Sequence, residues 1–214
     1  MANRQDHVIV FILSTLLFLI GVFVGVSLSR VRMGDVENRI NLFEKDMNLL
    51  EIAVLINDAL RNETLSCNFL KEQLNETNEE LKILGEKAIN YETEAKIKDD
   101  EYKVLKNRYN SLRAQYWLML EKLKNQCSNN YTTILFFYRT LTPCEECRDE
   151  GVILSHISMN YPNIYVVPVD ADEDSLLIKT LKDAFSVTET PTLIIDASRK
   201  ITGVINEDKL LSII

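Results

Sequence analysis

The chain has 214 residues, of which 46% are apolar and 26% charged, and its formal net charge is −8 at pH 7. This composition is typical of a globular protein with one or two domains and excludes wholesale disorder. The acidic balance argues against a nucleic-acid-binding protein, because such proteins concentrate basic side chains on one face.

An almost unbroken apolar run, Val8 to Leu28, comes first along the chain. At about 1.5 Å per residue, a helix of this length would cross the ~30 Å hydrocarbon core of a bilayer. A cleaved signal peptide is the alternative. Its apolar core would be shorter and a small-residue cleavage site would follow, whereas this run ends in Ser27-Leu28-Ser29-Arg30. The sequence therefore predicts an N-terminal segment, residues 1–34, with a transmembrane helix at about 8–28, and a single-pass membrane protein.

Two kinds of evidence disagree about the side of the membrane on which the rest of the chain would lie. Basic residues follow the apolar run more often than they precede it, which favours a cytoplasmic C-terminus: Arg4 lies before it, and Arg30, Arg32 and Arg39 after it. Two distant cysteines and three glycosylation sequons favour the opposite side, the sequons beginning at Asn62, Asn75 and Asn130. We expect the C-terminal part to be extracytoplasmic.

Residues 35–127 are expected to be helical. No proline occurs between the apolar run and Pro143, and Gly85 is the only glycine between Gly34 and Pro143. Apolar residues recur at heptad spacing over 60–91 and again over 102–123, on either side of a polar stretch. This pattern predicts an antiparallel helical hairpin with its tip near residue 97.

The distant cysteines, Cys67 and Cys127, each lie thirty residues from that tip. In an antiparallel pair of helices they would come level with each other, so they are candidates for a structural disulfide. The alternative is a pair of buried free thiols, which pack as small apolar side chains.

Residues 35–60 also carry periodic apolar positions, which would suit a helix or a parallel coiled coil. Gly21 and Gly25 have the spacing of a helix-dimer contact. These features leave open a homodimer through the transmembrane or coiled-coil region.

From residue 130 the pattern changes to strands alternating with helices. Strands are expected at 133–138, 164–170, 192–196 and 201–204, and helices at 145–160, 174–185 and from 206 or 207 onward. This order predicts an α/β domain over residues 130–214, with a mixed sheet flanked by helices.

Cys144 and Cys147 lie three positions apart where the first strand of this domain gives way to a helix. The N–H groups and partial positive charge of a helix start favour a thiolate over a thiol. One thiolate can attack a disulfide, and the second cysteine can release the mixed disulfide that forms.

The domain resembles the thioredoxin superfamily at three motifs over about 85 residues. They are Cys144-Glu145-Glu146-Cys147, Val169-Asp170-Ala171-Asp172, and Thr190-Pro191-Thr192-Leu193, with Pro191 lying 47 residues beyond Cys144. The resemblance implies a thioredoxin-like fold, with Cys144 as nucleophile and Cys147 as resolving thiol. It also implies a cis bond before Pro191 that exposes the backbone of Thr190 to an extended substrate strand. Its partners would be protein thiols or disulfides and an unknown redox partner, with no cofactor.

The sequence departs from the family at the site. Pro143 replaces the usual tryptophan, and Phe136 stands about where thioredoxins bury an acid. Glu145 and Glu146 add negative charge that disfavours a thiolate. We therefore expect a mild redox couple, with a reduction potential near the reducing end of the family's range.

Other functions fit the cysteines less well. A structural zinc site usually needs four ligands in two close pairs, and the only histidines are His7 and His156, so no metal is expected. The main alternative to a thiol–disulfide oxidoreductase is a redox-inactive thioredoxin-like binding or scaffold protein.

Overall fold

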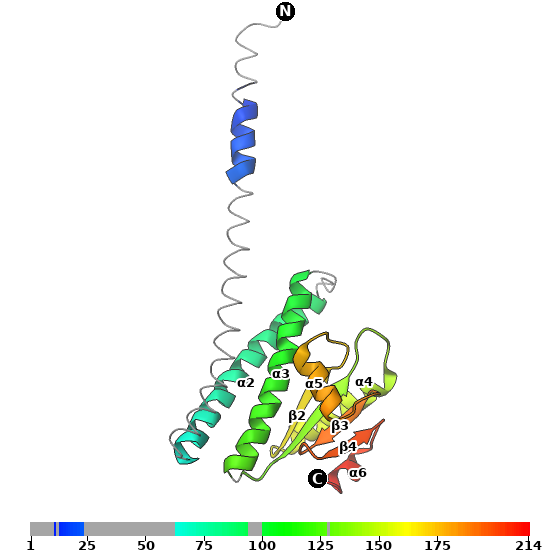
Figure 1. Ribbon diagram of the computed structural model, residues 1–214. Coiled ribbons are helices and arrows are strands. Elements are labelled where there is room, and N and C mark those ends of the chain that lie inside the picture. Colours follow the sequence, from blue (N-terminus) through cyan, green and yellow to red (C-terminus); the bar gives the residue numbers. More distant parts are fainter. Residues whose placement is uncertain (1–10, 12, 24–62, 94–99, 128) are drawn as a thin grey trace, which may run out of the picture. The chain divides into compact units, whose positions relative to one another are not determined.

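The computed structural model describes residues 11, 13–23, 63–93, 100–127 and 129–214 (Figure 1). The chain divides into two compact units, Met1–Leu60 and Arg61–Ile214. The predicted coiled coil at 35–60, the dimer contacts that depend on it and on Gly25, and the hairpin tip near residue 97 lie outside the described residues.

The prediction of a transmembrane helix at 8–28 is wrong. Among the described residues, no helix combines the length and the apolar character that a bilayer crossing requires. The prediction rested on the apolar character of the sequence, and side-chain hydropathy alone does not establish that a helix spans a bilayer. The predicted localisation, that of a single-pass membrane protein with an extracytoplasmic C-terminal part, depended on this helix and is also wrong.

A four-stranded mixed sheet forms the centre of the second unit. Its strands are β1 (Thr132–Tyr138), β2 (Ile164–Asp170), β3 (Thr192–Ile195) and β4 (Arg199–Thr202), in the order β2-β1-β3-β4. β1 pairs with β2 in parallel, and β3 runs antiparallel to both β1 and β4. All but the first and last residues of β1 are buried, as expected for an apolar central strand covered on both faces.

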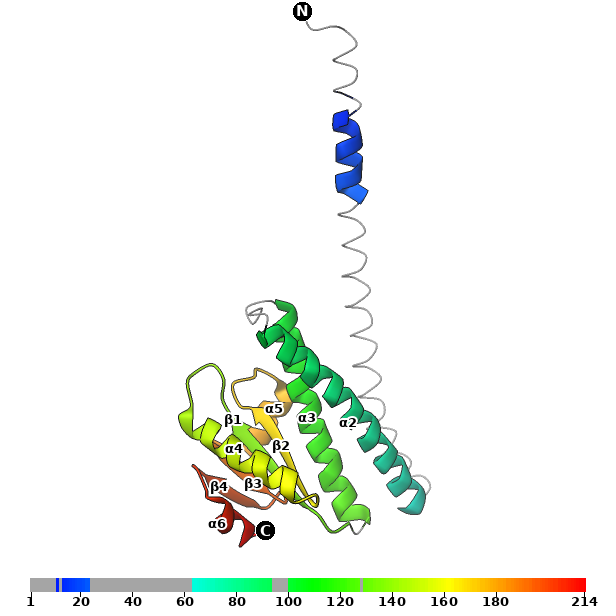
Figure 2. The ribbon, with the colours of Figure 1, turned by 180° about the vertical axis from the view of Figure 1, so that it is seen from behind.

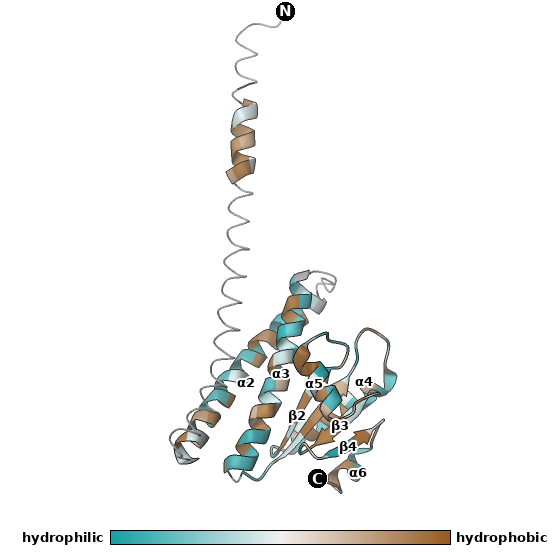
Figure 3. Cartoon of the chain, in the orientation of Figure 1, coloured by the Kyte–Doolittle hydropathy of each residue, from teal (hydrophilic) through white to brown (hydrophobic). Residues whose placement is uncertain are grey.

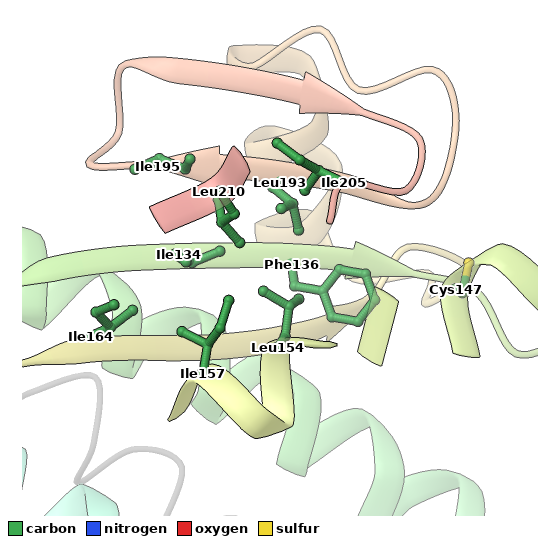
Figure 4. Packing of buried hydrophobic residues seen from close by; sticks show 10 residues of the cluster. All are labelled: Ile134, Phe136, Cys147, Leu154, Ile157, Ile164, Leu193, Ile195, Ile205 and Leu210. Carbon is green, nitrogen blue, oxygen red and sulfur yellow. The ribbon is translucent and has the colours of Figure 1, made fainter. Parts of the chain in front are cut away.

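Helices cover both faces of this sheet (Figures 1 and 2). Helices α4 (Glu145–Asn160) and α6 (Glu207–Leu211) lie on one face, and α5 (Leu176–Ala184) lies on the other. Figure 4 shows the core between α4, α6 and the sheet. Its buried members are Ile134, Phe136, Cys147, Leu154, Ile157, Ile164, Leu193, Ile195, Ile205 and Leu210. Cys147 therefore belongs to the apolar core as well as to the CxxC motif.

The last strand begins earlier than the sequence suggested. The strand was expected at 201–204, but Arg199 and Lys200 also lie on β4 and pair with Ile195 and Ile194. The turn is instead made at Asp196 and Ala197, both with positive φ. β4 is an edge strand and is mostly exposed, so it can carry polar and charged residues. These residues interrupt the alternation of apolar and polar positions by which a strand is recognised in a sequence.

The helical hairpin is formed by α2 (Glu63–Thr93) and α3 (Asp100–Cys127), which pack against each other. The apolar seam between them includes Leu84, Ala88, Leu105 and Leu112. Figure 3 shows hydrophobic and hydrophilic residues alternating along both helices. Gly85 faces Tyr109, where an added Cβ would lie 2.9 Å from the phenol oxygen. A side chain at position 85 would therefore require the Tyr109 ring to move.

α3 is also a layer of the α/β unit. It packs against β1, β2 and α5, on the sheet face opposite α4. Trp117 of α3 is 1% exposed, and its ring meets Phe185 edge-on with the centroids 5.7 Å apart. At the start of β1, the Thr133 hydroxyl donates a hydrogen bond to Glu121, and Lys124 pairs with Asp196 at 2.6 Å. Helix α3 thus packs against α2 and also against the sheet. The structure does not test the limits expected for the two domains, 35–127 and 130–214, and these limits remain a prediction.

The buried side chain of Asn110, on α3, forms hydrogen bonds with the backbone at the end of the edge strand β2. The Nδ2 of Asn110 donates to the carbonyl of Asp170 at 3.1 Å, and its Oδ1 accepts the Asp170 N–H at 2.7 Å. Asn110→Ala would leave both buried backbone groups without partners, so we expect it to lower the free energy of unfolding by about 2 kcal/mol. Urea denaturation of the full chain measures this.

Asn107 provides the matched control for that variant, because it is exposed on the same helix. Asn107→Ala should change the free energy of unfolding by less than about 0.5 kcal/mol. Equal losses in the two variants would mean that the Asn110 contacts contribute nothing specific.

Candidate active site

Cys144 and Cys147 lie at the start of α4, beyond the end of β1. Cys144 is the N-cap of the helix, and its Sγ accepts the N–H of Cys147 at 3.2 Å. The two sulfurs form a disulfide with an S–S distance of 1.99 Å. Cys144 is partly exposed, whereas Cys147 is buried at 6% exposure. Within the pair, Cys144 is therefore the sulfur that a large partner could reach.

The helix start gives Cys144 a favourable environment for a thiolate. An N–H donor directed at the sulfur and the positive end of the helix dipole both stabilise the charged form. Glu145 and Glu146 occupy the first turn of α4 and oppose this effect, although both are exposed and hence largely screened by water.

The loop before β3 lies beside Cys144. The Thr190–Pro191 peptide bond is cis, and the carbonyl oxygen of Thr190 is 4.0 Å from the Cys144 Sγ. The N–H of Thr190 has no hydrogen-bond partner in the part of the chain that the structure describes. The structure thus brings together four residues singled out from the sequence: Cys144, Cys147, Thr190 and Pro191.

An open pocket of about 400 Å³ adjoins this group of residues. Its lining carries three carboxylates and one guanidinium, and the lining residues are Arg139, Pro143, Cys144, Glu145, Glu146, Glu189 and Thr190. Arg139 donates from Nε to the Thr190 hydroxyl at 2.9 Å, so it ties the loop after β1 to the cis-proline loop. The sequence did not point to Arg139 or Glu189, because neither lies in a recognisable motif.

The loop leading into Cys144 is anchored to β2 and to α3. Asp172 accepts the N–H groups of Thr140 and Leu141 at 3.1 and 2.9 Å. The Thr140 hydroxyl donates to Asp170 at 2.5 Å, and Lys106 of α3 pairs with the same carboxylate at 2.7 Å. These contacts fix the approach to the CxxC from the hairpin side.

A buried carboxyl, Glu150, also lies on α4 near the cysteine pair. It is 0% exposed and accepts the Ile205 N–H at 2.9 Å. Burial raises the pKa of Glu150, an effect that the Ile205 hydrogen bond opposes. The sequence analysis missed it, yet the helical period could have revealed it, because the buried face of α4 is Cys147, Glu150, Leu154 and Ile157.

The other two cysteines lie at the base of the hairpin. Cys67 and Cys127 form a disulfide with an S–S distance of 1.97 Å and a Cα–Cα distance of 5.8 Å. Among the described residues, no group of three or more histidine, cysteine, aspartate or glutamate side chains could hold a metal ion. His156 is largely exposed and pairs with Glu207 at 2.8 Å.

Solved structures to which this chain is similar include three thioredoxins. The thioredoxin-2 of a malaria parasite is 21% identical, covering 40% of this chain and 82% of its own, with a TM-score of 0.34. Fasciola hepatica thioredoxin is 24% identical, covering 45% and 88%, with a TM-score of 0.35. Thioredoxin O2 from Arabidopsis thaliana is 19% identical, covering 47% and 84%, with a TM-score of 0.35. No protein-family model and no curated protein matches the chain.

Proposed function

We propose that this protein is a thiol–disulfide oxidoreductase that works through the Cys144–Cys147 pair. The observation that carries the proposal is the asymmetry of the pair: Cys144 is accessible at a helix start, and Cys147 lies behind it in the core. A nucleophilic sulfur has to meet its partner, whereas a resolving sulfur has only to reach the first.

In the reaction, the Cys144 thiolate attacks one sulfur of a substrate disulfide and the other substrate sulfur leaves as a thiol. Cys147 then attacks Cys144, which releases the second substrate thiol and re-forms the Cys144–Cys147 bond. Two electrons pass from the protein dithiol to the substrate. The reverse sequence oxidises a substrate dithiol, and a redox partner would reset the pair in either direction.

Substrate proteins would bind as extended segments along the cis-proline loop. The Thr190 N–H, to which the described residues offer no acceptor, and the Thr190 carbonyl beside Cys144 support this mode, because an added strand pairs through such backbone groups. The pocket gives room for side chains on either side of the substrate cysteine. Its carboxylates, Glu145, Glu146 and Glu189, favour substrates with basic side chains there.

Cys147→Ser tests this proposal against a redox-inactive binding module. Without the resolving thiol, the variant should accumulate mixed disulfides through Cys144 when it is reduced and mixed with a disulfide-containing protein. Non-reducing electrophoresis followed by mass spectrometry detects them. The Cys144→Ser/Cys147→Ser double variant is the control and should form none. An absence of adducts, together with resistance of Cys144 to alkylation in the reduced protein, would exclude the enzyme.

A further inference from the structure

Four exposed residues lead directly into Cys144. They are residues 140–143, which follow β1. Because no buried apolar side chain holds such a stretch, its position depends on hydrogen bonds and ion pairs. Cys144 comes next as the N-cap of α4, where its Sγ accepts the Cys147 N–H. The place of Cys144 at the helix start therefore depends on the contacts that hold these four residues.

The carboxylate of Asp170 is the centre of those contacts on the hairpin side. Its side chain is only 4% exposed. The Oδ1 of Asp170 accepts the Asp172 N–H at 3.0 Å, and the Oδ2 accepts the Thr140 hydroxyl at 2.5 Å. Asp172 in turn accepts the backbone N–H groups of Thr140 and Leu141. Asp170 thus holds the loop directly, and also through Asp172.

Lys106 of α3 supplies the cation for this carboxylate. Its Nζ lies 2.7 Å from the Asp170 Oδ2 and 2.5 Å from the Thr140 Oγ1. A threonine hydroxyl has one proton, which goes here to Asp170, so its oxygen can accept a hydrogen bond from the ammonium group. Lys106, Thr140 and Asp170 therefore form a closed triangle. Removing the lysine would leave a buried carboxylate without its counter-ion, which is costly.

A second ion pair joins α3 to the sheet at the other end of the helix. Lys124 lies 2.6 Å from Asp196, which accepts the N–H of Thr133 near the start of β1. The two lysines are similarly buried, with side chains 29% and 23% exposed. The Lys106 pair contacts the loop that follows β1, whereas the Lys124 pair contacts the opposite end of that strand. Comparing them separates an effect on the loop from a general attachment of α3.

We propose that Lys106 is a positioning residue for Cys144, an inference that rests on the proposed function. The ammonium group holds Thr140 against Asp170, and the anchored loop keeps Cys144 at the start of α4. There the Cys147 N–H and the helix dipole stabilise the thiolate that attacks a disulfide. Helix α3 of the hairpin is thereby part of the redox site, although it contributes no reacting atom.

The reactivity of the Cys144 thiol measures this role directly. In the freshly reduced full chain with Cys147→Ser, the tryptic peptide between Arg139 and Arg148 contains a single cysteine. Mass spectrometry of that peptide follows alkylation of Cys144 by iodoacetamide. In this background we expect Lys106→Met to slow alkylation at pH 7 about tenfold, since the thiolate loses a hydrogen bond and the helix dipole. Lys106→Arg keeps the charge and the donors, so it should restore most of the rate.

Lys124→Met in the same background is the matched control. It removes an ion pair of the same helix but leaves the loop untouched, so Cys144 should react at the rate of the background chain. Equal losses in the Lys106→Met and Lys124→Met chains would mean that Lys106 only attaches α3, which would overturn the positioning role. An unchanged rate in a folded Lys106→Met chain would overturn it as well.

Thr140→Val decides the case in which Lys106→Met fails to fold. It removes an exposed hydroxyl and retains the pair between Lys106 and Asp170. We expect it to slow alkylation of Cys144 too. The double variant with Lys106→Met should be no slower than the slower single variant, because both side chains act through one contact. A Thr140→Val chain with an unchanged rate, or single losses that multiply in the double variant, would overturn the proposal.

Reduction of insulin disulfides tests the proposed function separately, in chains that retain Cys147. Lys106→Met should slow this reaction by about tenfold as well, because a displaced nucleophile attacks less efficiently. If the wild-type chain reduced no insulin while alkylation of Cys144 still depended on Lys106, the proposed function would be wrong and the positioning role would stand.

Discussion

Cys144→Ser is expected to abolish disulfide exchange, reducing the rate to that of the reductant alone. A serine hydroxyl stays protonated at neutral pH and does not attack sulfur, and the buried Cys147 cannot meet a protein substrate in its place. The assay follows the reduction of insulin disulfides by dithiothreitol with and without the protein. Because Cys144 is partly exposed, the substitution should leave the fold intact.

Val152→Ala serves as the control for that variant. Val152 lies on α4 but is 66% exposed and takes no part in the site, so its loss should leave the rate unchanged. Wild-type activity in Cys144→Ser would show that another group carries the reaction, and the proposed order of attack would be wrong.

The Cys67→Ser/Cys127→Ser double variant is expected to lose about 4 kcal/mol of unfolding free energy, by the chain-entropy argument for a long cross-linked loop. The two cysteines are 60 residues apart in sequence, so their bond greatly restricts the unfolded chain. Urea denaturation of the full chain under oxidising conditions measures the loss. The rate of disulfide exchange should remain that of the wild type.

The Cys144→Ser/Cys147→Ser double variant supplies the comparison for stability. Its disulfide joins residues only three apart, so the same argument predicts less than half the loss. A Cys67→Ser/Cys127→Ser protein that unfolds at the wild-type urea concentration would contradict a stabilising bond at the hairpin base.

The elements around the CxxC could be predicted because each has an unambiguous pattern. The apolar run of β1, the helical period of α4 and the second buried strand β2 lie close to their expected positions. Cys144 therefore fell at a strand-to-helix junction in the sequence as it does in the structure. The edge strand β4 was misplaced because its exposed residues carry no burial signal.

The sequence predicted that Trp117 packs against the C-terminal domain, and its ring does meet Phe185 beyond the end of α5. The contact of Asn110 with β2 could not be predicted in the same way. A heptad pattern records that a helix has an apolar face, but it does not say which polar side chains of that helix will be buried by a second partner. Glu150 was missed for a related reason, since a charged residue is ordinarily assigned to the solvated face of a helix.

The length of α3 keeps the two sulfur pairs of this protein chemically separate. The helix meets the CxxC loop at Lys106, which bonds to Thr140, and it ends at Cys127 in the hairpin disulfide. The two residues are 21 positions apart, which corresponds to about 30 Å of helix. A thiolate at Cys144 therefore cannot reach the Cys67–Cys127 bond within its own chain, and the proposed disulfide exchange would leave that bond intact.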